Sequence, residues 1–181
     1  SIMNRMRKLT PEELKARQGS SDRRIMPVAL LLEKIRSMYN VGSFFRTGDG
    51  AGVEKVFISG WTAAPPRKEI SKVALGAEEV VPFEKVAQDA AQAAETIRSQ
   101  GYHLIAVEHT STSRNLYEFN LPFPCCLVFG HEVEGISPPL LAQCEASVEV
   151  PMYGVKESLN VAVCAGAVLF EARRQWEARK G

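Results

Sequence analysis

A short apolar run without polar alternation constrains the fold of this chain more than any other feature. Residues 28–32 read Val-Ala-Leu-Leu-Leu, and a strand that has no polar face needs cover on both sides. Segments 102–107 and 125–129 have the same character, and shorter strands are predicted at 56–59, 80–81 and 147–150. Helical patterns separate these strands. We therefore expect an α/β fold, in which a parallel sheet is flanked by helices on both faces.

The helical patterns fall in four places along this alternation. A short helix is predicted from about residue 40, a longer one over 84–100 with Gly101 as its stop, a capped one over 137–141, and a terminal one from about 159 to 179. Residues 61–68 contain two adjacent prolines, which a sheet interior excludes, so this segment is predicted to be a loop.

The amino-terminal part of the chain differs in charge from the rest. Residues 1–36 carry nine Lys and Arg against four Asp and Glu, or +5, whereas the remainder carries thirteen against seventeen, or −4. We divide the chain into a basic arm over 1–24 and a domain over 25–181. Thr10 is expected to cap a helix in the arm that starts at Pro11. Charge alone does not distinguish an arm that binds a polyanion from a solvated one.

Composition excludes several other classes of protein. The 181 residues are 45% hydrophobic and 24% charged, which fits one globular domain. No apolar run is long enough to cross a membrane, and none of signal-peptide length precedes Pro27, so we expect a cytoplasmic protein. The four cysteines lack C-x-x-C spacing and have no matching histidine pair. Free cysteines and no metal site are therefore expected.

A glycine-bounded turn marks the predicted ligand site. Residues 130–135 read Gly-His-Glu-Val-Glu-Gly and follow a buried strand. Ligands of parallel α/β sheets bind beyond the carboxyl ends of the strands, where this turn should lie. The turn is not G-x-G-x-x-G, and the chain contains no P-loop, so dinucleotide binding and phosphoryl transfer are disfavoured.

Three separated segments carry a further pattern: 40–53, 127–152 and 158–175. Together they resemble the three signature motifs of the SpoU/TrmH family of RNA methyltransferases, in the SPOUT superfamily. They begin Asn-Val-Gly-Ser-Phe-Phe-Arg-Thr, Leu-Val-Phe-Gly-His-Glu and Ser-Leu-Asn-Val-Ala-Val, and the similarity extends over about 27–176. The resemblance implies a C-terminal trefoil knot, a homodimer, and an enzyme that transfers a methyl group from S-adenosylmethionine to a ribose 2′-hydroxyl of tRNA or rRNA. The domain over 25–181 is then the catalytic domain.

The resemblance also implies which residues form the site. The expected cofactor-binding residues are Gly130, Val150, Met152, Leu159 and Val107. Gly130 permits close approach of backbone to a ligand, and Val150 and Leu159 offer apolar contact to adenine. The expected RNA-phosphate contacts are Arg67, Lys68, Arg23, Arg24 and Lys156.

The catalytic candidates are Arg46, Asn40, Glu132, Ser158 and Asn160. Because a guanidinium loses its proton only above about pH 12, we assign Arg46 to clamping a phosphate and stabilising oxyanion charge rather than to general-base catalysis. Asn40 orders the site or caps its helix. Glu132 orients Arg46 or Asn160, or assists proton movement. Ser158 and Asn160 hold loop and substrate groups, unless Ser158 merely begins the terminal helix.

Two further features bear on partners and alternatives. His131 stands where the family more often has a small residue, and is expected to be a wall of the site. Residues 161–170 are apolar nearly all round, which fits burial against both the core and a second subunit. The alternatives are a base-methylating SPOUT enzyme, a knotted RNA-binding protein without activity, and, least favoured, a generic nucleotide-binding α/β domain.

Overall fold

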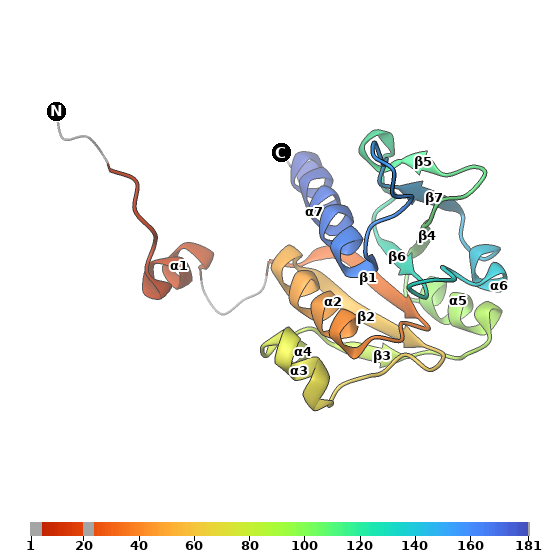
Figure 1. The fold of residues 1–181 in the computed structure, drawn as a ribbon, viewed down its shortest axis with the longest axis horizontal. Helices are drawn as coiled ribbons and strands as arrows, with labels where there is room; N and C mark the ends of the chain where they lie inside the picture. Colours follow the sequence, from red (N-terminus) through yellow and green to blue (C-terminus); the bar gives the residue numbers. More distant parts are fainter. Residues whose placement is uncertain (1–4, 20–23, 181) are drawn as a thin grey trace.

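The computed structural model describes residues 5–19 and 24–180, so Arg23 lies outside the described residues. A parallel sheet forms the centre of the domain, with strand order β3-β2-β1-β6-β4-β7-β5 (Figure 1). Its strands are β1 (Met26–Glu33), β2 (Val53–Ser59), β3 (Phe83–Lys85), β4 (His103–Val107), β5 (Arg114–Asn115), β6 (Cys125–Phe129) and β7 (Ala146–Glu149). The predicted parallel α/β sheet is confirmed.

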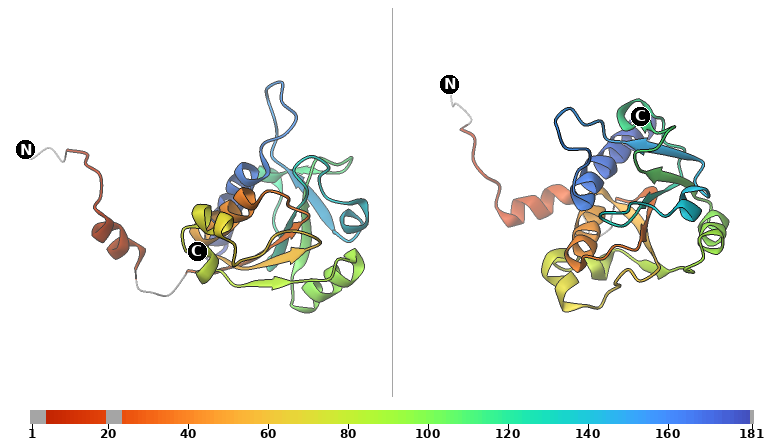
Figure 2. Two further views of the ribbon diagram at one scale, coloured as in Figure 1. Left: turned by 60° about the horizontal axis from the view of Figure 1, so that its bottom comes forward. Right: turned by 45° about the vertical axis from the view of Figure 1, so that its right-hand side comes forward.

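Helices cover both faces of this sheet (Figures 1 and 2). Helices α2 (Met38–Ala51), α3 (Lys68–Ala74), α4 (Ala77–Val80) and α7 (Val161–Lys180) pack on one face, and α5 (Ala90–Ser99) and α6 (Pro138–Leu141) on the other. A single 3-10 turn, η1 (Leu116–Glu118), follows β5.

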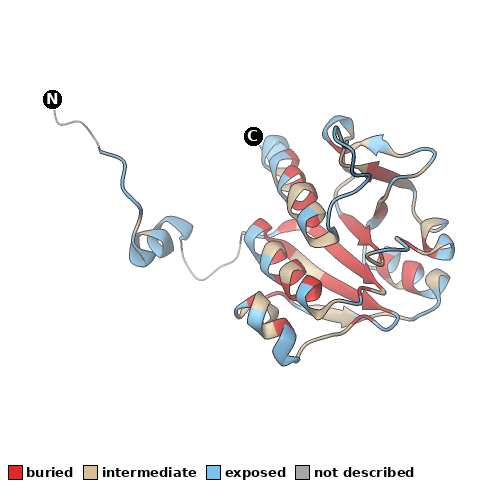
Figure 3. Cartoon of the chain, in the orientation of Figure 1, coloured by how far each residue is buried: buried red, intermediate tan, exposed pale blue. Residues whose placement is uncertain are grey.

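Strand β1 explains why its sequence has no polar face. Val28, Leu30 and Leu32 belong to the core under α2 and α7, whereas Ala29 and Leu31 belong to the core under α5 and α6. All five are fully buried, as the red central strands in Figure 3 show. Alternate side chains of a strand point to opposite faces, so a doubly covered strand needs apolar residues at every position.

The amino-terminal helix α1 (Pro11–Gln18) forms as its sequence predicts. Thr10 Oγ1 accepts the N–H of Glu13, and the Glu13 carboxylate accepts the N–H of Thr10, which completes a capping box. No residue of α1 is buried, and the helix stands apart from the sheet (Figure 1). Capping, rather than a hydrophobic face, therefore stabilises this helix.

The segment between β2 and α5 differs from the prediction. Residues 80–81 are not a strand: Val80 ends α4, and the short strand β3 lies just beyond, paired with β2 from Val56↔Phe83 to Ile58↔Lys85. The helix predicted over 84–100 begins only at Ala90, because Asp89 caps it by accepting the N–H of Gln92. Helix α3 was not predicted, since its seven residues show too little periodicity.

Among residues 5–19 and 24–180, no helix is both long and apolar enough to cross a bilayer. The same residues contain no group of three or more His, Cys, Asp or Glu side chains placed to hold a metal ion. The four cysteines are free, and burial raises the pKa of each thiol above its usual value.

Candidate functional site

A pocket of about 170 Å³ opens beyond the carboxyl ends of β4, β6 and β7. The turn over 130–135 forms one wall, and the segment that connects β7 to α7 forms the opposite wall. In Figure 2 this connecting segment projects from the body of the domain as a blue loop. The pocket therefore lies where parallel α/β sheets bind ligands.

The structure brings the predicted cofactor-binding residues together. All five line this one pocket: Val107, Gly130, Val150, Met152 and Leu159. Val107 ends β4, Gly130 directly follows β6, and Val150 directly follows β7. Because parallel strands end at one edge of the sheet, residues 20 or more positions apart in sequence become neighbours there.

Gly130 lies where the turn over 130–135 closes on itself. A Cβ atom at this position would lie 2.4 Å from the carbonyl carbon of Gly135 and 2.4 Å from the nitrogen of Ile136. The backbone at the other end of the same turn therefore closely approaches Gly130. At that end Gly135 has a φ of +72°, and its N–H donates to the carbonyl of His131.

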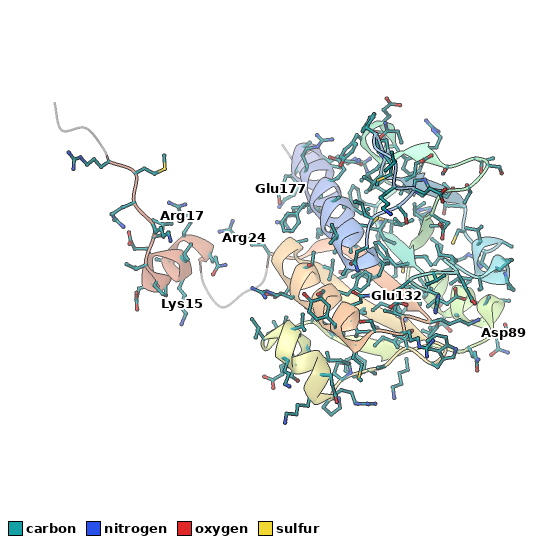
Figure 4. The ribbon with its side chains drawn as sticks, in the orientation of Figure 1. Lys15, Arg17, Arg24, Asp89, Glu132 and Glu177 are labelled. Carbon is teal, nitrogen blue, oxygen red and sulfur yellow. The ribbon has the colours of Figure 1, made fainter. Side chains whose placement is uncertain are left out.

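Glu132 joins this turn to the start of α2. Its carboxylate accepts the backbone N–H of Arg36 at 3.2 Å, the backbone N–H of Ser37 at 3.0 Å and the side-chain amide of Asn40 at 3.2 Å. Figure 4 labels Glu132 at the centre of the domain. Burial acts to raise the pKa of Glu132, but these hydrogen bonds outweigh it, and the pKa is lowered. Within this chain, Glu132 therefore contacts the start of α2, whereas Arg46 is exposed and Asn160 contacts the start of α7.

The cap of α2 is Ser37, whose hydroxyl accepts the N–H of Asn40. Asn40 is 5% exposed and directs its side chain to Glu132. Of the two readings of Asn40, the helix-capping one is wrong, and the contact with Glu132 fits the ordering of the site. The first motif is thus tied to the second through one asparagine–glutamate hydrogen bond.

Asn160 caps the terminal helix. Its Oδ1 accepts the N–H groups of Ala162 and Val163 at 2.9 and 3.2 Å, as an N-cap residue does. Helix α7 begins at Val161, so Ser158 does not begin it. Ser158 instead lies in the connecting segment and lines the pocket.

Arg46 lies on α2 and does not line the pocket. It is exposed. Gly50, four residues further on and so on the same helix face, faces α7: a Cβ there would lie 3.7 Å from the ring of Phe170. On α7, Phe170 is 53% exposed and Val163 61% exposed. Arg46 therefore borders an apolar surface that one chain leaves uncovered.

The predicted RNA contacts do not form one cluster. Arg67 and Lys68 are exposed at the start of α3, and Lys156 is exposed in the segment between β7 and α7. Arg24 precedes β1, so it lies at the amino edge of the sheet, opposite the pocket. Figure 4 labels Arg24 well away from Glu132. Within one chain, Arg24 and Lys156 therefore lie on different surfaces of the domain.

Several pocket residues were not singled out from the sequence. They are Glu108, His109, Phe129, Glu149, Val161 and Cys164. His109 Nδ1 lies 2.7 Å from Glu149 Oε2, and Ser113 Oγ donates to Glu149 Oε1 at 2.9 Å. The Ser113 and His109 contacts lower the pKa of Glu149. Their positions in the sequence could have identified three of these residues, because Glu108 and His109 directly follow β4 and Glu149 ends β7.

Glu108 fixes the end of the turn. Its Oε2 accepts the N–H of Ile136 at 3.0 Å, and its Oε1 accepts the N–H of His109 at 3.2 Å. The pocket thus combines apolar walls with carboxylates from Glu108, Glu132, Glu134 and Glu149. Such a site suits a ligand that carries both an apolar group and positive charge.

Fold and pocket together define the class of protein: an α/β domain whose ligand site is assembled from three separated segments at the carboxyl edge of a parallel sheet. Residues 27–170 match the SpoU rRNA Methylase family, and the chain belongs to that family.

Individual relatives agree with this membership. The chain is 34% identical over 154 residues to a 23S rRNA (guanosine-2′-O-)-methyltransferase, RlmB, of Vibrio parahaemolyticus; the match covers 85% of this chain and 62% of that protein. The chain therefore spans about three fifths of the length of that relative.

Solved structures share the fold. A TrmH/SpoU tRNA modifying enzyme of A. aeolicus superposes with a TM-score of 0.77 at 26% identity, over 87% of this chain and 80% of that one. An AdoMet-bound rRNA methyltransferase from Sinorhizobium meliloti gives a TM-score of 0.73 at 27% identity, over 84% of this chain and 57% of that one.

Proposed function

We propose that this protein transfers a methyl group from S-adenosylmethionine to a ribose 2′-hydroxyl of RNA. The observation that carries the proposal is the pocket at the carboxyl edge, where the five predicted cofactor residues meet Glu132 and Ser158. Family membership supports it, as do the functions of the relatives, which modify rRNA or tRNA.

The residues of the pocket fit the cofactor. Val107, Val150 and Leu159 supply apolar walls for an adenine ring, and Met152 extends them. The carboxylates of Glu108 and Glu149 suit the sulfonium and ammonium charges. When bound, the cofactor supplies an electrophilic methyl group. The AdoMet-bound relative supports this assignment.

We assign the positioning of the site and the binding of RNA to five residues of this chain. Glu132 and Asn40 hold the turn over 130–135 against the start of α2, so the pocket wall and the helix that carries Arg46 keep one geometry. Asn160 fixes the start of α7, and Ser158 offers a hydroxyl to the pocket. Arg46 clamps an RNA phosphate and stabilises the developing oxyanion.

The proposal includes a homodimer, because Arg46 is exposed outside the pocket of its own chain. The uncovered surface of α2 and α7, with Val163 and Phe170 on it, is the surface we assign to the second subunit. In this arrangement Arg46 of one subunit completes the site of the other. We also propose that the segment between β7 and α7 threads through the chain as a trefoil knot, in keeping with the family.

Mixed dimers test the role of Arg46. One tagged chain carries Arg46→Ala, and a differently tagged chain carries Val150→Arg, which blocks the pocket. If Arg46 acts across the dimer, the purified heterodimer keeps one intact site of two and about half of the wild-type rate, while both homodimers are inactive. If Arg46 acts within its own chain, the heterodimer is inactive as well.

The reaction itself is tested by incubating the protein with S-adenosylmethionine and total tRNA or rRNA, followed by nuclease digestion and nucleoside mass spectrometry. The expected product is a 2′-O-methylated nucleoside. A base-methylated nucleoside would instead identify a base-methylating SPOUT enzyme. Absence of cofactor binding by calorimetry would identify a protein without activity.

A further inference from the structure

A large aromatic side chain stands beside the pocket without a role in it. Trp61 lies two residues beyond the end of β2 and is 52% exposed. It belongs to neither hydrophobic core. A single exposed aromatic residue is common on protein surfaces, so its surroundings decide whether it has a function.

Trp61 contacts the wall of the pocket through His131. The two rings meet edge to face, with centroids 5.9 Å apart and planes at 79°, and His131 lines the pocket. The last residue of β2, Ser59, pairs with Glu33 of β1. The last residue of β6, Phe129, pairs with Leu32 of β1. Both aromatic residues therefore project from the same edge of the sheet, a short distance beyond the last paired row.

Hydrogen bonds hold the ring of His131 and the backbone beside Trp61 in place. Nδ1 of His131 accepts the N–H groups of Val133 and Glu134 at 3.1 and 3.0 Å. Thr62, next to Trp61, is 7% exposed; its hydroxyl accepts the N–H of Ile35 at 2.9 Å and donates to the carbonyl of Leu32 at 3.3 Å. The backbone at Trp61 is thus anchored to the end of β1. A fixed aromatic surface loses little conformational entropy when it binds a ligand.

Three cations lie on segments that adjoin Trp61, while the turn of His131 also carries Glu132 and Glu134. A Cβ atom on Gly60 would lie 3.2 Å from Cγ of Lys34, so the lysine stem runs beside the residue that precedes Trp61. The side chain of Arg36 is exposed at the start of α2, and Arg67 is exposed at the end of the loop that Trp61 begins. Exposed aromatic rings among cations suit single-stranded RNA, because bases stack on the rings and phosphates contact the cations.

We infer that Trp61, held by His131, stacks on an unpaired base of the RNA next to the nucleotide whose ribose enters the pocket, with Lys34, Arg36 and Arg67 facing the phosphates. The inference rests on the proposed function for the position of the methylated ribose. It adds a base-stacking contact to the phosphate contacts expected from the sequence, and makes the protein prefer a splayed strand over a regular duplex.

Fluorescence of Trp61 provides a direct test. The chain has two tryptophans, and Trp176 packs on Phe123 at 5.4 Å in another part of the fold. In a Trp176→Phe background, a single-stranded oligoadenylate 12-mer should quench the emission of Trp61 and protect it from acrylamide. A blunt RNA duplex of equal length should do so less, and S-adenosylmethionine alone should not protect it. Equal protection by both RNAs, or by neither, would overturn the inference.

Substitution separates this contact from the proposed reaction. Trp61→Ala should weaken binding of the 12-mer by about 10-fold or more and Trp61→Phe by less, with cofactor affinity unchanged by calorimetry. Tyr117→Ala is the matched control, because Tyr117 is 53% exposed on η1, and it should bind RNA normally. If Trp61→Ala binds RNA normally, or instead dissociates the dimer in sedimentation, stacking is refuted even where methyl transfer is observed. If methyl transfer is absent but quenching occurs, only the proposed function fails.

Discussion

Replacing Glu132 with alanine removes the carboxylate that joins the turn over 130–135 to the start of α2. Three N–H groups lose their acceptor, those of Arg36 and Ser37 in the backbone and that of the Asn40 side chain. A hydrogen bond to a charged group contributes about 1.5–3 kcal/mol. Because the site is partly exposed, water replaces some of this, and we expect a total loss of about 2–3 kcal/mol of unfolding free energy.

For a domain of this size such a loss lowers Tm by roughly 4–12 °C, which differential scanning calorimetry resolves. Glu134→Ala is the matched control: Glu134 lies on the same turn and is exposed, so its replacement should change stability by less than about 0.5 kcal/mol. Equal melting temperatures for the two variants would refute the structural role of Glu132.

The pH dependence supplies a second readout for Glu132. Its pKa in the folded protein lies below the ordinary value of 4.5. The carboxylate therefore contributes its full stabilisation above the ordinary value, and loses it as pH falls through the lowered pKa. The difference in stability between wild type and Glu132→Gln should be constant from about pH 6 upward and should shrink at more acidic pH. A difference that grows on acidification would contradict this assignment.

Three further predictions concern the pocket and the arm. Gly130→Ala should reduce cofactor affinity at least several-fold in calorimetry, because its Cβ would lie 2.4 Å from two backbone atoms of the same turn; unchanged affinity would mean that the turn relaxes freely. Burial raises the pKa of the Cys164 thiol to about 11, so its alkylation, followed by peptide mass spectrometry, should be slow at pH 7 and rise about tenfold per pH unit. S-adenosylmethionine should slow it further, since Cys164 lines the pocket. Thr10→Ala should reduce helicity of α1 in circular dichroism without lowering the Tm of the domain, because α1 buries no residue.

Local patterns in the sequence were enough to predict the layered fold and the edge of the sheet at which the pocket lies. Strand β1 has to be covered on both faces because every one of its central residues is apolar, and this follows from the alternation of side chains alone. The five cofactor positions were implied by the resemblance to the SpoU/TrmH motifs, whereas the strand pattern predicted only that a ligand site lies beyond the carboxyl ends of the parallel strands. The cap at Thr10 is likewise a local property of four residues.

Contacts between groups far apart in the sequence became visible only in the folded chain. The bond between Asn40 and Glu132 joins residues 92 positions apart, and no local pattern distinguishes it from a pairing with Arg46. Phe83 to Lys85 form a strand because β2 offers them an unpaired edge, which overrides a helical composition. Arg46 is exposed, and Trp61 contacts His131, because of how distant elements pack. The periodicity of a sequence carries no information about such packing.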